Sequence, residues 1–316
     1  MKIAVLDDYQ NVAREMADWS GLEREHEITF FSDIYEGLDG FARRLAPYEI
    51  VCIMRERSPF KRDLIERLPK LKLVVTAGMR NAALDLDACK DRGIPVLGTG
   101  GSAQATPELA WGLMLSLARN IHLENARMRE GAWITTLGLD MQGKTLGILG
   151  LGRLGTKMAK IAHAFEMNVI AWSQNLTDEA AAEAGAVRVD KAELFARSDF
   201  ITIHYKLGER SRGLVGAAEL AQMKPTAYLI NTSRGPIVDT DALIAALTEG
   251  RIAGAGIDVY DAEPLPPDHP IRSCPRTLLT PHLGYVTEGT YRAFYGEIVE
   301  CLESWLAGSQ IRVLSP

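Results

Sequence analysis

The sequence is poor in cysteine and lacks the marks of several large protein classes. It has four cysteines in 316 residues and no Cys-x-x-Cys pair. This spacing suggests neither a disulfide framework nor a cysteine-based zinc site, and no metal is expected. No uninterrupted apolar run of about 20 residues occurs, and the apolar start of the chain is too short for a signal peptide. We therefore expect a cytoplasmic protein with no membrane span.

An excess of positive charge is also missing. The chain has 35 Lys and Arg against 41 Asp and Glu, for a net charge of −6 and a pI of about 5.6. This balance argues against a nucleic-acid partner. With 47% hydrophobic and 24% charged residues, the composition is that of an ordinary globular protein. At about 150 residues per domain, the length favours two domains.

Short apolar segments alternate with amphipathic helical patterns along the chain. Strands are expected at Lys2–Leu6, Ile28–Phe31, Ile50–Met54, Leu73–Thr76, Val96–Leu97, Asn168–Trp172, Phe200–His204, Ala227–Asn231, Gly256–Val259 and Leu278–Thr280. Helices are expected at Asn11–Trp19, Gly40–Leu45, Lys61–Leu68, Asp85–Asp91, Thr106–Arg129, Leu154–Phe165 and Thr287–Leu306. This alternation predicts an α/β fold with parallel sheets covered on both faces.

The strand and helix pattern is interrupted once, by Gly98-Thr-Gly-Gly-Ser102, and restarts at Lys144. If the last expected helix, Thr287–Leu306, packs back on the N-terminal domain, residues 1–102 and 287–316 form one domain and residues 103–286 form a second domain inserted into it. Ligands of such sheets bind at the carboxyl ends of the strands. Candidate functional residues should therefore follow the strands directly.

A glycine motif follows one expected strand and opens a helix. It reads Gly150-Leu-Gly152-Arg-Leu-Gly155, in the strand–turn–helix context that a dinucleotide-binding motif requires. Gly150 permits the tight turn, Gly152 allows a pyrophosphate close to the backbone, and Gly155 allows the helix to pack on the strand. The motif predicts a dinucleotide cofactor that is bound through its pyrophosphate.

The residue that would contact the cofactor ribose is unusual. An acid is expected about 20 residues after the motif, where it binds the ribose 2′-hydroxyl of NAD. Ser173 occupies this place, and a serine does not repel a 2′-phosphate as an acid would. Ser173 therefore allows either cofactor, NAD(P), with NADP(H) slightly favoured. The next residues, Gln174 and Asn175, supply no arginine that would bind the 2′-phosphate.

Three chemically active side chains also follow expected strands. These are Arg234, Glu263 and His282. An arginine can bind a carboxylate through two hydrogen bonds. A histidine titrates near neutrality and can give or take a hydroxyl proton. A carboxylate next to the histidine favours the imidazolium and orients the ring.

The four segments Gly150–Gly155, Asn231–Gly235, Asp258–Pro264 and Thr280–Gly284 resemble those of the D-isomer-specific 2-hydroxyacid dehydrogenase family in order and spacing. The resemblance implies a Rossmann-type dinucleotide-binding domain inserted into a flavodoxin-like substrate (catalytic) domain. It also implies a homodimer formed through the dinucleotide-binding domain. The implied activity interconverts a small anionic 2-oxo acid and a D-2-hydroxy acid with NAD(P)H.

The resemblance also implies roles for individual residues. Arg234 would bind substrate, Glu263 would raise the basicity of the histidine, and His282 would be the acid/base. The implied cofactor contacts, besides the glycines and Ser173, are Arg153, Leu154, Tyr205, Thr232, Asp258 and Gly284. The substrate carboxylate would be bound by backbone N–H groups of Ala77, Gly78, Met79 and Arg80.

The loop at Met79 and Arg80 departs from the family, whose members commonly have a small pair there. Arg80, or Arg55 at the end of an earlier strand, could contact a second acidic group of the substrate. Glyoxylate or hydroxypyruvate is the favoured kind of substrate, and D-3-phosphoglycerate dehydrogenase activity is the alternative. A non-catalytic nicotinamide-dependent scaffold or corepressor is a further alternative, since fold alone does not fix function.

Overall fold

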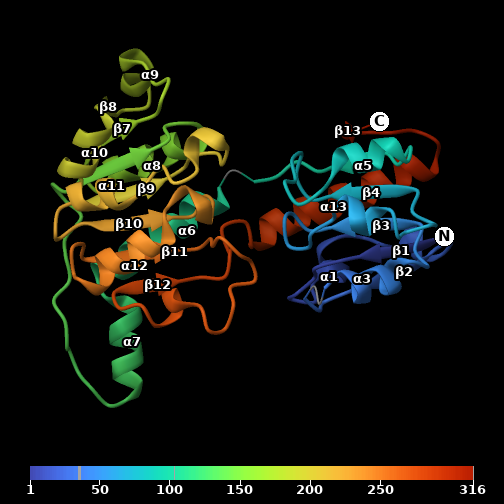
Figure 1. Ribbon diagram of the computed structural model, residues 1–316, viewed down its shortest axis with the longest axis horizontal. Coiled ribbons are helices and arrows are strands. Elements are labelled where there is room, and N and C mark those ends of the chain that lie inside the picture. The colour runs from blue at the N-terminus through green and yellow to red at the C-terminus, as the bar shows by residue number, and fades with distance from the viewer. Residues whose placement is uncertain (35–36, 103, 316) are drawn as a thin grey trace. The chain divides into compact units, whose positions relative to one another are not determined.

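The computed structural model describes residues 1–34, 37–102 and 104–315. The expected domain boundary at residue 103 falls outside these ranges. The chain divides into two compact units, which we call unit 1 (Met1–Ser102 with Val286–Pro316) and unit 2 (Ala103–Tyr285). Unit 2 is thus one continuous segment, whereas unit 1 is built from both ends of the chain (Figure 1).

Unit 1 contains a six-stranded sheet. Its strands are β1 (Lys2–Val5), β2 (Glu27–Phe30), β3 (Ile50–Ile53), β4 (Leu73–Thr76), β5 (Val96–Gly98) and β13 (Val313–Ser315). The order is β13-β5-β4-β3-β1-β2, and all pairs are parallel except β13 with β5. The five parallel strands have the order of flavodoxin-like folds. The antiparallel edge strand was not expected from the sequence.

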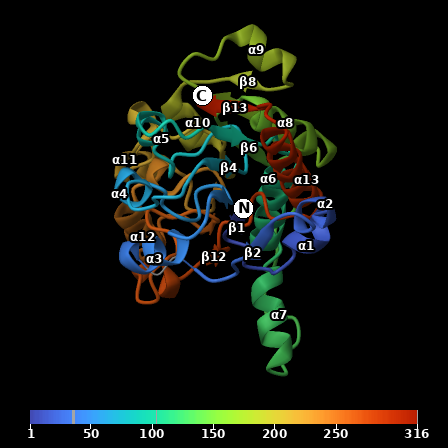
Figure 2. The same ribbon diagram turned by 90° about the vertical axis from the view of Figure 1, so that its right-hand side faces the viewer.

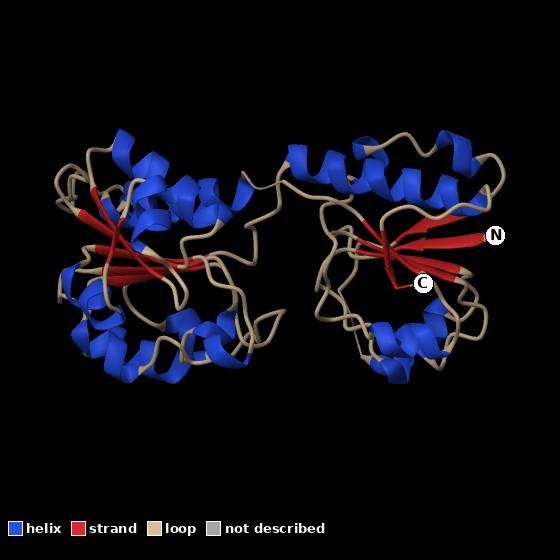
Figure 3. Ribbon diagram, turned by 90° about the horizontal axis from the view of Figure 1, so that it is seen from above, coloured by secondary structure: helices blue, strands red, loops and turns tan. Residues whose placement is uncertain are grey.

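Helices cover both faces of this sheet (Figure 3). They are α1 (Ala13–Met16), α2 (Ser20–Glu23), α3 (Leu38–Leu45), α4 (Arg62–Ile65), α5 (Leu86–Asp91) and α13 (Glu288–Leu306). The single helix expected at Asn11–Trp19 is wrong. Asn11 has a left-handed φ of 56°, and the carboxylate of Asp8 accepts hydrogen bonds from the N–H groups of Val12 and Ala13. The helix therefore starts late, and it ends where Ala17 is extended.

Unit 2 contains a seven-stranded sheet in which every strand pair is parallel. Its strands are β6 (Thr145–Leu149), β7 (Asn168–Trp172), β8 (Val187–Arg188), β9 (Phe200–Ile203), β10 (Tyr228–Asn231), β11 (Gly254–Ile257) and β12 (Thr277–Leu279). The order β12-β11-β10-β9-β6-β7-β8 is the Rossmann order with one added strand. Strand order reverses at β6, so the carboxyl end of β6 is the expected ligand position.

The helices of unit 2 also lie on both faces of their sheet. They are α6 (Ala105–Ala118), α7 (Ile121–Arg129), α8 (Arg153–Ala164), α9 (Asp178–Glu183), α10 (Lys191–Arg197), α11 (Ala217–Gln222) and α12 (Thr240–Thr248). Helices α6 and α8 pack on one core and α10, α11 and α12 on another. Within the described ranges, no helix is both long and apolar enough to cross a membrane.

The long helix expected at Thr106–Arg129 is wrong, because the chain breaks it into α6 and α7. Asn120 lies between them with a left-handed φ of 54°. Asparagine adopts this conformation more readily than most side chains, so a helix can end there without glycine or proline. Helix α7 buries none of its residues and extends away from the rest of unit 2 (Figure 2).

Candidate active site

The glycine motif forms a tight loop between β6 and α8. Gly150 has a φ of 102°, and a Cβ atom there would lie 2.5 Å from the carbonyl oxygen of His204. A Cβ atom on Gly155 would clash with the carbonyl oxygen of Gly150. Next to Gly152, by contrast, the space around the Cβ position is open among the described residues. The loop is therefore closely packed on its inner side and accessible at its middle glycine.

The N-terminus of α8 is suited to bind an anion. Gly152 precedes the helix, no side chain caps it, and its first turn has Arg153 and Leu154 but no acid. The first N–H groups of a helix attract phosphate when no side chain satisfies them. In the part of the chain that the structure describes, the buried hydroxyl of Thr232 also has no hydrogen-bond partner. These residues fit a cofactor with a pyrophosphate group.

Ser173 lies at the end of β7 and contacts the glycine loop. Its Oγ accepts a hydrogen bond from the N–H of Leu151 at 2.9 Å. The ring of Tyr205 stacks on Trp172 with centroids 6.1 Å apart, and its hydroxyl accepts from the N–H of Gln174 at 3.1 Å. The position expected to bind the ribose therefore carries a hydroxyl and no negative charge.

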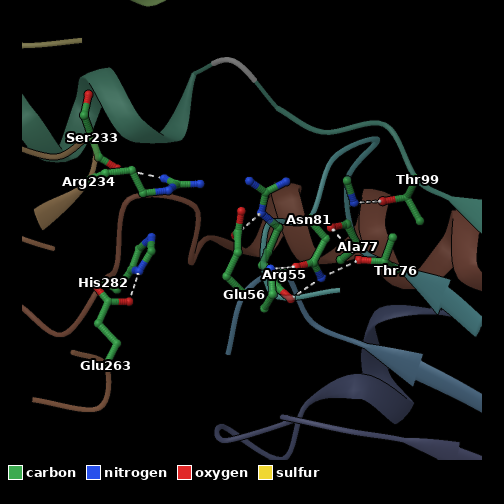
Figure 4. A network of polar contacts seen from close by, with 12 residues as sticks. Arg55, Glu56, Thr76, Ala77, Asn81, Thr99, Ser233, Arg234, Glu263 and His282 are labelled. Atoms are coloured by element: carbon green, nitrogen blue, oxygen red, sulfur yellow. Dashed lines mark hydrogen bonds and ion pairs between the residues drawn. The ribbon is translucent and has the colours of Figure 1, made fainter. Parts of the chain in front are cut away.

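His282 and Glu263 are in direct contact. The Nδ1 atom of His282 lies 2.5 Å from Oε2 of Glu263, and the other carboxylate oxygen accepts from the N–H of Tyr260 at 2.9 Å (Figure 4). The glutamate is thus fixed by its own loop and in turn orients the imidazole. Because Nδ1 is engaged, Nε2 is the ring atom left to exchange a proton with another molecule.

Asp258 holds the loop that carries His282. Its Oδ1 accepts from the Thr280 hydroxyl at 2.6 Å and the Leu283 N–H at 2.7 Å, and its Oδ2 accepts from the Gly284 N–H at 2.9 Å. His282 itself has a left-handed φ of 55°. The carboxyl is fully buried, and burial raises its pKa against the opposing effect of these hydrogen bonds. Sequence reasoning gave Asp258 a cofactor contact and missed this internal role.

Arg234 lies in the loop after β10, which packs on the loop that contains Glu263. Its Nη1 donates to the carbonyl of Ser233 at 2.7 Å, and its own carbonyl accepts from Asn231 at 3.0 Å. A Cβ atom on Gly235 would clash with the backbone of Tyr260. The two loops therefore support each other, and unit 2 carries Arg234, Glu263 and His282 on the loops that follow β10, β11 and β12.

The Ala77–Arg80 loop follows β4 in unit 1. The Ala77 N–H donates to the carbonyl of Ile53 at 2.9 Å, and the Gly78 N–H donates to the Thr99 hydroxyl at 2.8 Å. Among the described residues, the N–H groups of Met79 and Arg80 have no acceptor. Of the four N–H groups assigned to the carboxylate, two are thus already used inside unit 1.

Arg55 contacts this loop from the end of β3. It has a left-handed φ of 55°, and a Cβ atom on Gly78 would clash with its guanidinium. Asn81 fixes the arrangement, since its Nδ2 donates to the Arg55 carbonyl at 2.5 Å and lies 3.0 Å from the Thr76 hydroxyl (Figure 4). Sequence reasoning missed Asn81, although an asparagine in a turn after a strand is a usable signal for such a bridge.

Comparisons with known proteins place this arrangement in one family. The family model "D-isomer specific 2-hydroxyacid dehydrogenase, NAD binding domain" matches residues 111–284. A glyoxylate reductase of Thermococcus litoralis is 41% identical over 236 residues, which cover 72% of this chain and 71% of that protein. A D-3-phosphoglycerate dehydrogenase of Methanocaldococcus jannaschii is 37% identical over 262 residues, 82% of this chain. The match spans 50% of that longer relative.

The solved structures agree. A phosphoglycerate oxidoreductase from Vibrio cholerae superposes with a TM-score of 0.93 at 35% identity, and the match covers 98% of this chain and 100% of the other. The fold is therefore a Rossmann-type nicotinamide-binding domain inserted into a flavodoxin-like domain. On the family model, the relatives and the site geometry together, this chain belongs to the D-isomer-specific 2-hydroxyacid dehydrogenase family.

Proposed function

We propose that this protein reduces a small 2-oxo acid of the glyoxylate or hydroxypyruvate kind to a D-2-hydroxy acid. The contact between His282 and Glu263 carries the proposal, because a histidine supported by a carboxylate is the acid that such a reduction needs. Relatives named glyoxylate reductase and hydroxypyruvate reductase support it. A nicotinamide cofactor, when bound, supplies the hydride.

The chain's own side chains perform binding and proton transfer. Arg234 binds the substrate carboxylate and draws electron density from the neighbouring carbonyl. In unit 1, the backbone N–H groups of Met79 and Arg80 are the proposed donors to a substrate carboxylate. His282, protonated and paired with Glu263, gives its Nε2 proton to the carbonyl oxygen as the C–O double bond becomes a single bond. The products are the hydroxy acid and a neutral imidazole, which takes up a proton from solvent.

A second candidate is activity on a phosphorylated substrate, as in a D-3-phosphoglycerate dehydrogenase. The observation that favours it is the guanidinium of Arg55 against Gly78, where it could meet a second anionic group. Several relatives with this name support it. The two candidates differ in the substituent next to the carbonyl and share the chemistry of His282.

The cofactor preference follows from Ser173. We propose that NADP(H) is slightly favoured over NAD(H), because the serine hydroxyl lacks the charge that would repel a 2′-phosphate. Since Oγ already accepts from Leu151, the hydroxyl proton is available to donate to the cofactor. Arg153 at the start of α8 supplies positive charge for the pyrophosphate. Asp258 is the proposed contact of the nicotinamide carboxamide, and Tyr205, Thr232 and Gly284 are the proposed further cofactor contacts.

We also propose a homodimer formed through unit 2. The segment after α7 exposes Trp133, Ile134 and Leu137, the last to 94%. Glu124 on α7 accepts hydrogen bonds from Thr135 and Thr136, so this segment is tied to the helix and its apolar side chains are held outward. Large exposed apolar patches mark interfaces, and a second copy is the commonest partner. A cytoplasmic location belongs to the same proposal and fits the four free cysteines.

The activity is tested with purified protein and glyoxylate, hydroxypyruvate and 3-phosphohydroxypyruvate, each with NADH and NADPH. We expect turnover, and we expect His282→Ala to lower kcat by about 100-fold or more while cofactor affinity stays within about threefold. His26→Ala is the control, because His26 lies in unit 1 next to the N-terminal amino group. Full turnover by His282→Ala would refute the acid role. Absence of wild-type turnover with cofactor bound would favour the scaffold, and a strong NADH preference would refute the argument from Ser173.

A further inference from the structure

An acid that the proposed function does not use lies beside the Ala77–Arg80 loop. Oε2 of Glu56 lies 3.5 Å from Nε of Arg55, and the two side chains are only 19% and 24% exposed. Figure 4 shows the two side chains next to each other at the end of β3. Because Arg55 also touches Gly78, its positive charge is shared between the loop and Glu56.

Both chain neighbours of Glu56 are anchored by hydrogen bonds. The carbonyl of the preceding residue accepts from Asn81, as described above. The following residue, Arg57, donates from Nη1 to the carbonyl of Asp7 at 2.6 Å and from Nη2 to the hydroxyl of Tyr291 at 2.8 Å. The chain at Glu56 is therefore fixed, and its carboxyl lies within ion-pair distance of Arg55.

We propose that Glu56 is a specificity-determining residue that restricts the substrate to 2-oxo acids with a single negative charge and excludes phosphorylated ones. The inference rests on the proposed function and deepens it by choosing between its two candidates. A phosphate group at Arg55 would bring up to two negative charges close to the Glu56 carboxylate. Repulsion between like charges is strong where burial limits screening by solvent.

A neutral hydroxyl group suits the same position. A carboxylate accepts hydrogen bonds and donates none, so Glu56 can accept a hydrogen bond from a substrate hydroxyl. Sites built to pair a hydroxyl discriminate strongly against analogues that cannot make the bond. The pair of Arg55 and Glu56 therefore favours a substrate of the hydroxypyruvate kind, with the carboxylate as its one charged group.

The test compares kcat/KM for hydroxypyruvate and 3-phosphohydroxypyruvate in the wild type, Glu56→Gln and Glu66→Gln. Glu66, which follows α4 and pairs with Arg62 at the surface, is the matched control. We expect the wild type to favour hydroxypyruvate by about tenfold or more, and we expect Glu56→Gln to reduce this ratio about tenfold, mainly through the KM of the phosphorylated substrate. Glu66→Gln should keep the wild-type ratio. A wild-type preference for the phosphorylated substrate, or an unchanged ratio in Glu56→Gln, would overturn the proposal.

A second variant and a binding measurement distinguish failure of the Glu56 proposal from misfolding of the variant and from failure of the proposed function. Should Glu56→Gln fail to fold, Glu56→Asp keeps the charge on a shorter side chain and should give an intermediate ratio. If the wild type turns over neither compound, the proposed function fails, and selectivity is then measured as the rise in Tm that each compound produces. Glu56 as the determinant predicts a larger rise with hydroxypyruvate for the wild type and a smaller difference for the variant. If the two compounds differ by the same amount in the wild type and in Glu56→Gln, the role of Glu56 is refuted.

Discussion

His282 and Glu263 lie 2.5 Å apart, Nδ1 to Oε2, although 18 residues separate them in the chain and they follow different strands. The histidine sits in a left-handed backbone conformation, and the glutamate is held by the N–H of Tyr260. Each partner is thus positioned by its own loop rather than by the contact alone. A substitution at Glu263 can therefore remove its negative charge and still leave a hydrogen-bonding group next to His282.

Glu263→Gln keeps a hydrogen-bonding group next to His282 and removes the charge. The amide no longer offers a negative charge to the imidazole, so we expect kcat/KM for reduction to fall about 10- to 100-fold. Steady-state kinetics at a fixed pH measure this change. Asp261→Asn, which changes an acid of the same loop bonded to Thr240, should keep the wild-type kcat/KM. A wild-type kcat/KM in Glu263→Gln would exclude an electrostatic role.

Asp258→Asn should loosen the loop of His282. An amide has one acceptor oxygen, so its NH2 group would face a backbone N–H of Leu283 or Gly284 that now donates to the carboxylate. We expect a loss of about 1–3 kcal/mol in the free energy of unfolding and a lower kcat. Urea unfolding and steady-state kinetics measure both. Thr280→Val removes one donor only and should have a smaller effect, whereas wild-type stability in Asp258→Asn would contradict the anchoring role.

Asp7 should make the stability of unit 1 depend on pH. Burial raises its pKa from 3.8 to about 6, and among the described residues its Oδ2 has no hydrogen-bond partner. The folded state then holds the proton more tightly than the unfolded state between these values. The free energy of unfolding therefore falls as pH rises from about 4 to about 6, by up to ~3 kcal/mol at 1.36 kcal/mol per unit.

Asp7→Asn removes this titrating group. We expect the variant to lack the fall in stability that the wild type shows over this range, as measured by urea unfolding at half-unit pH steps. Asp87→Asn, at an exposed position in α5, should follow the wild type. Parallel curves for the wild type and Asp7→Asn would show that the carboxyl does not titrate in this window.

The exposed segment after α7 gives a prediction about assembly. The double variant Trp133→Glu, Leu137→Glu places two charges in the proposed interface, where they would be buried without partners. We expect light scattering to report a dimer for the wild type and a monomer for the variant, with the melting temperature of the variant lowered. Val187→Glu, at an exposed apolar position on β8, should remain dimeric. A monomeric wild type, or a dimeric double variant, would refute the proposed interface.

Local patterns in the sequence predicted many of the strands and helices. The strands Leu73–Thr76 and Asn168–Trp172 have the predicted bounds and are built around the apolar runs Leu73–Val75 and Val169–Trp172, because a parallel strand buried on both faces needs continuous apolar residues. The helix break at Asn120 was missed, since one asparagine among helix-forming residues is a weak stop signal. Strand β13 was missed because its three residues form a strand only by pairing with β5.

The candidate site was foreseen where it follows strand ends and missed where it depends on tertiary contacts. The positions of Arg234 and His282 after parallel strands were enough to place both in one unit. The bridge from Asn81 to Arg55 joins two loops that are 26 residues apart in the chain. The ion pair of Arg55 with Glu56 lies between adjacent residues, and no sequence pattern shows that their side chains meet. The sequence also does not show which backbone N–H groups already donate a hydrogen bond within the protein, as that of Gly78 does.

The division of the chain into two units has an evolutionary consequence. Unit 2 holds the glycine loop, His282, Glu263 and Arg234, whereas unit 1 holds Glu56 and the Ala77–Arg80 loop. Under the proposed assignments, unit 2 carries the residue that transfers the proton, and unit 1 carries the residues that select the substrate. Substitutions in unit 1 can then change which acid is accepted while proton transfer stays intact, so new substrate ranges can arise by divergence of one unit alone.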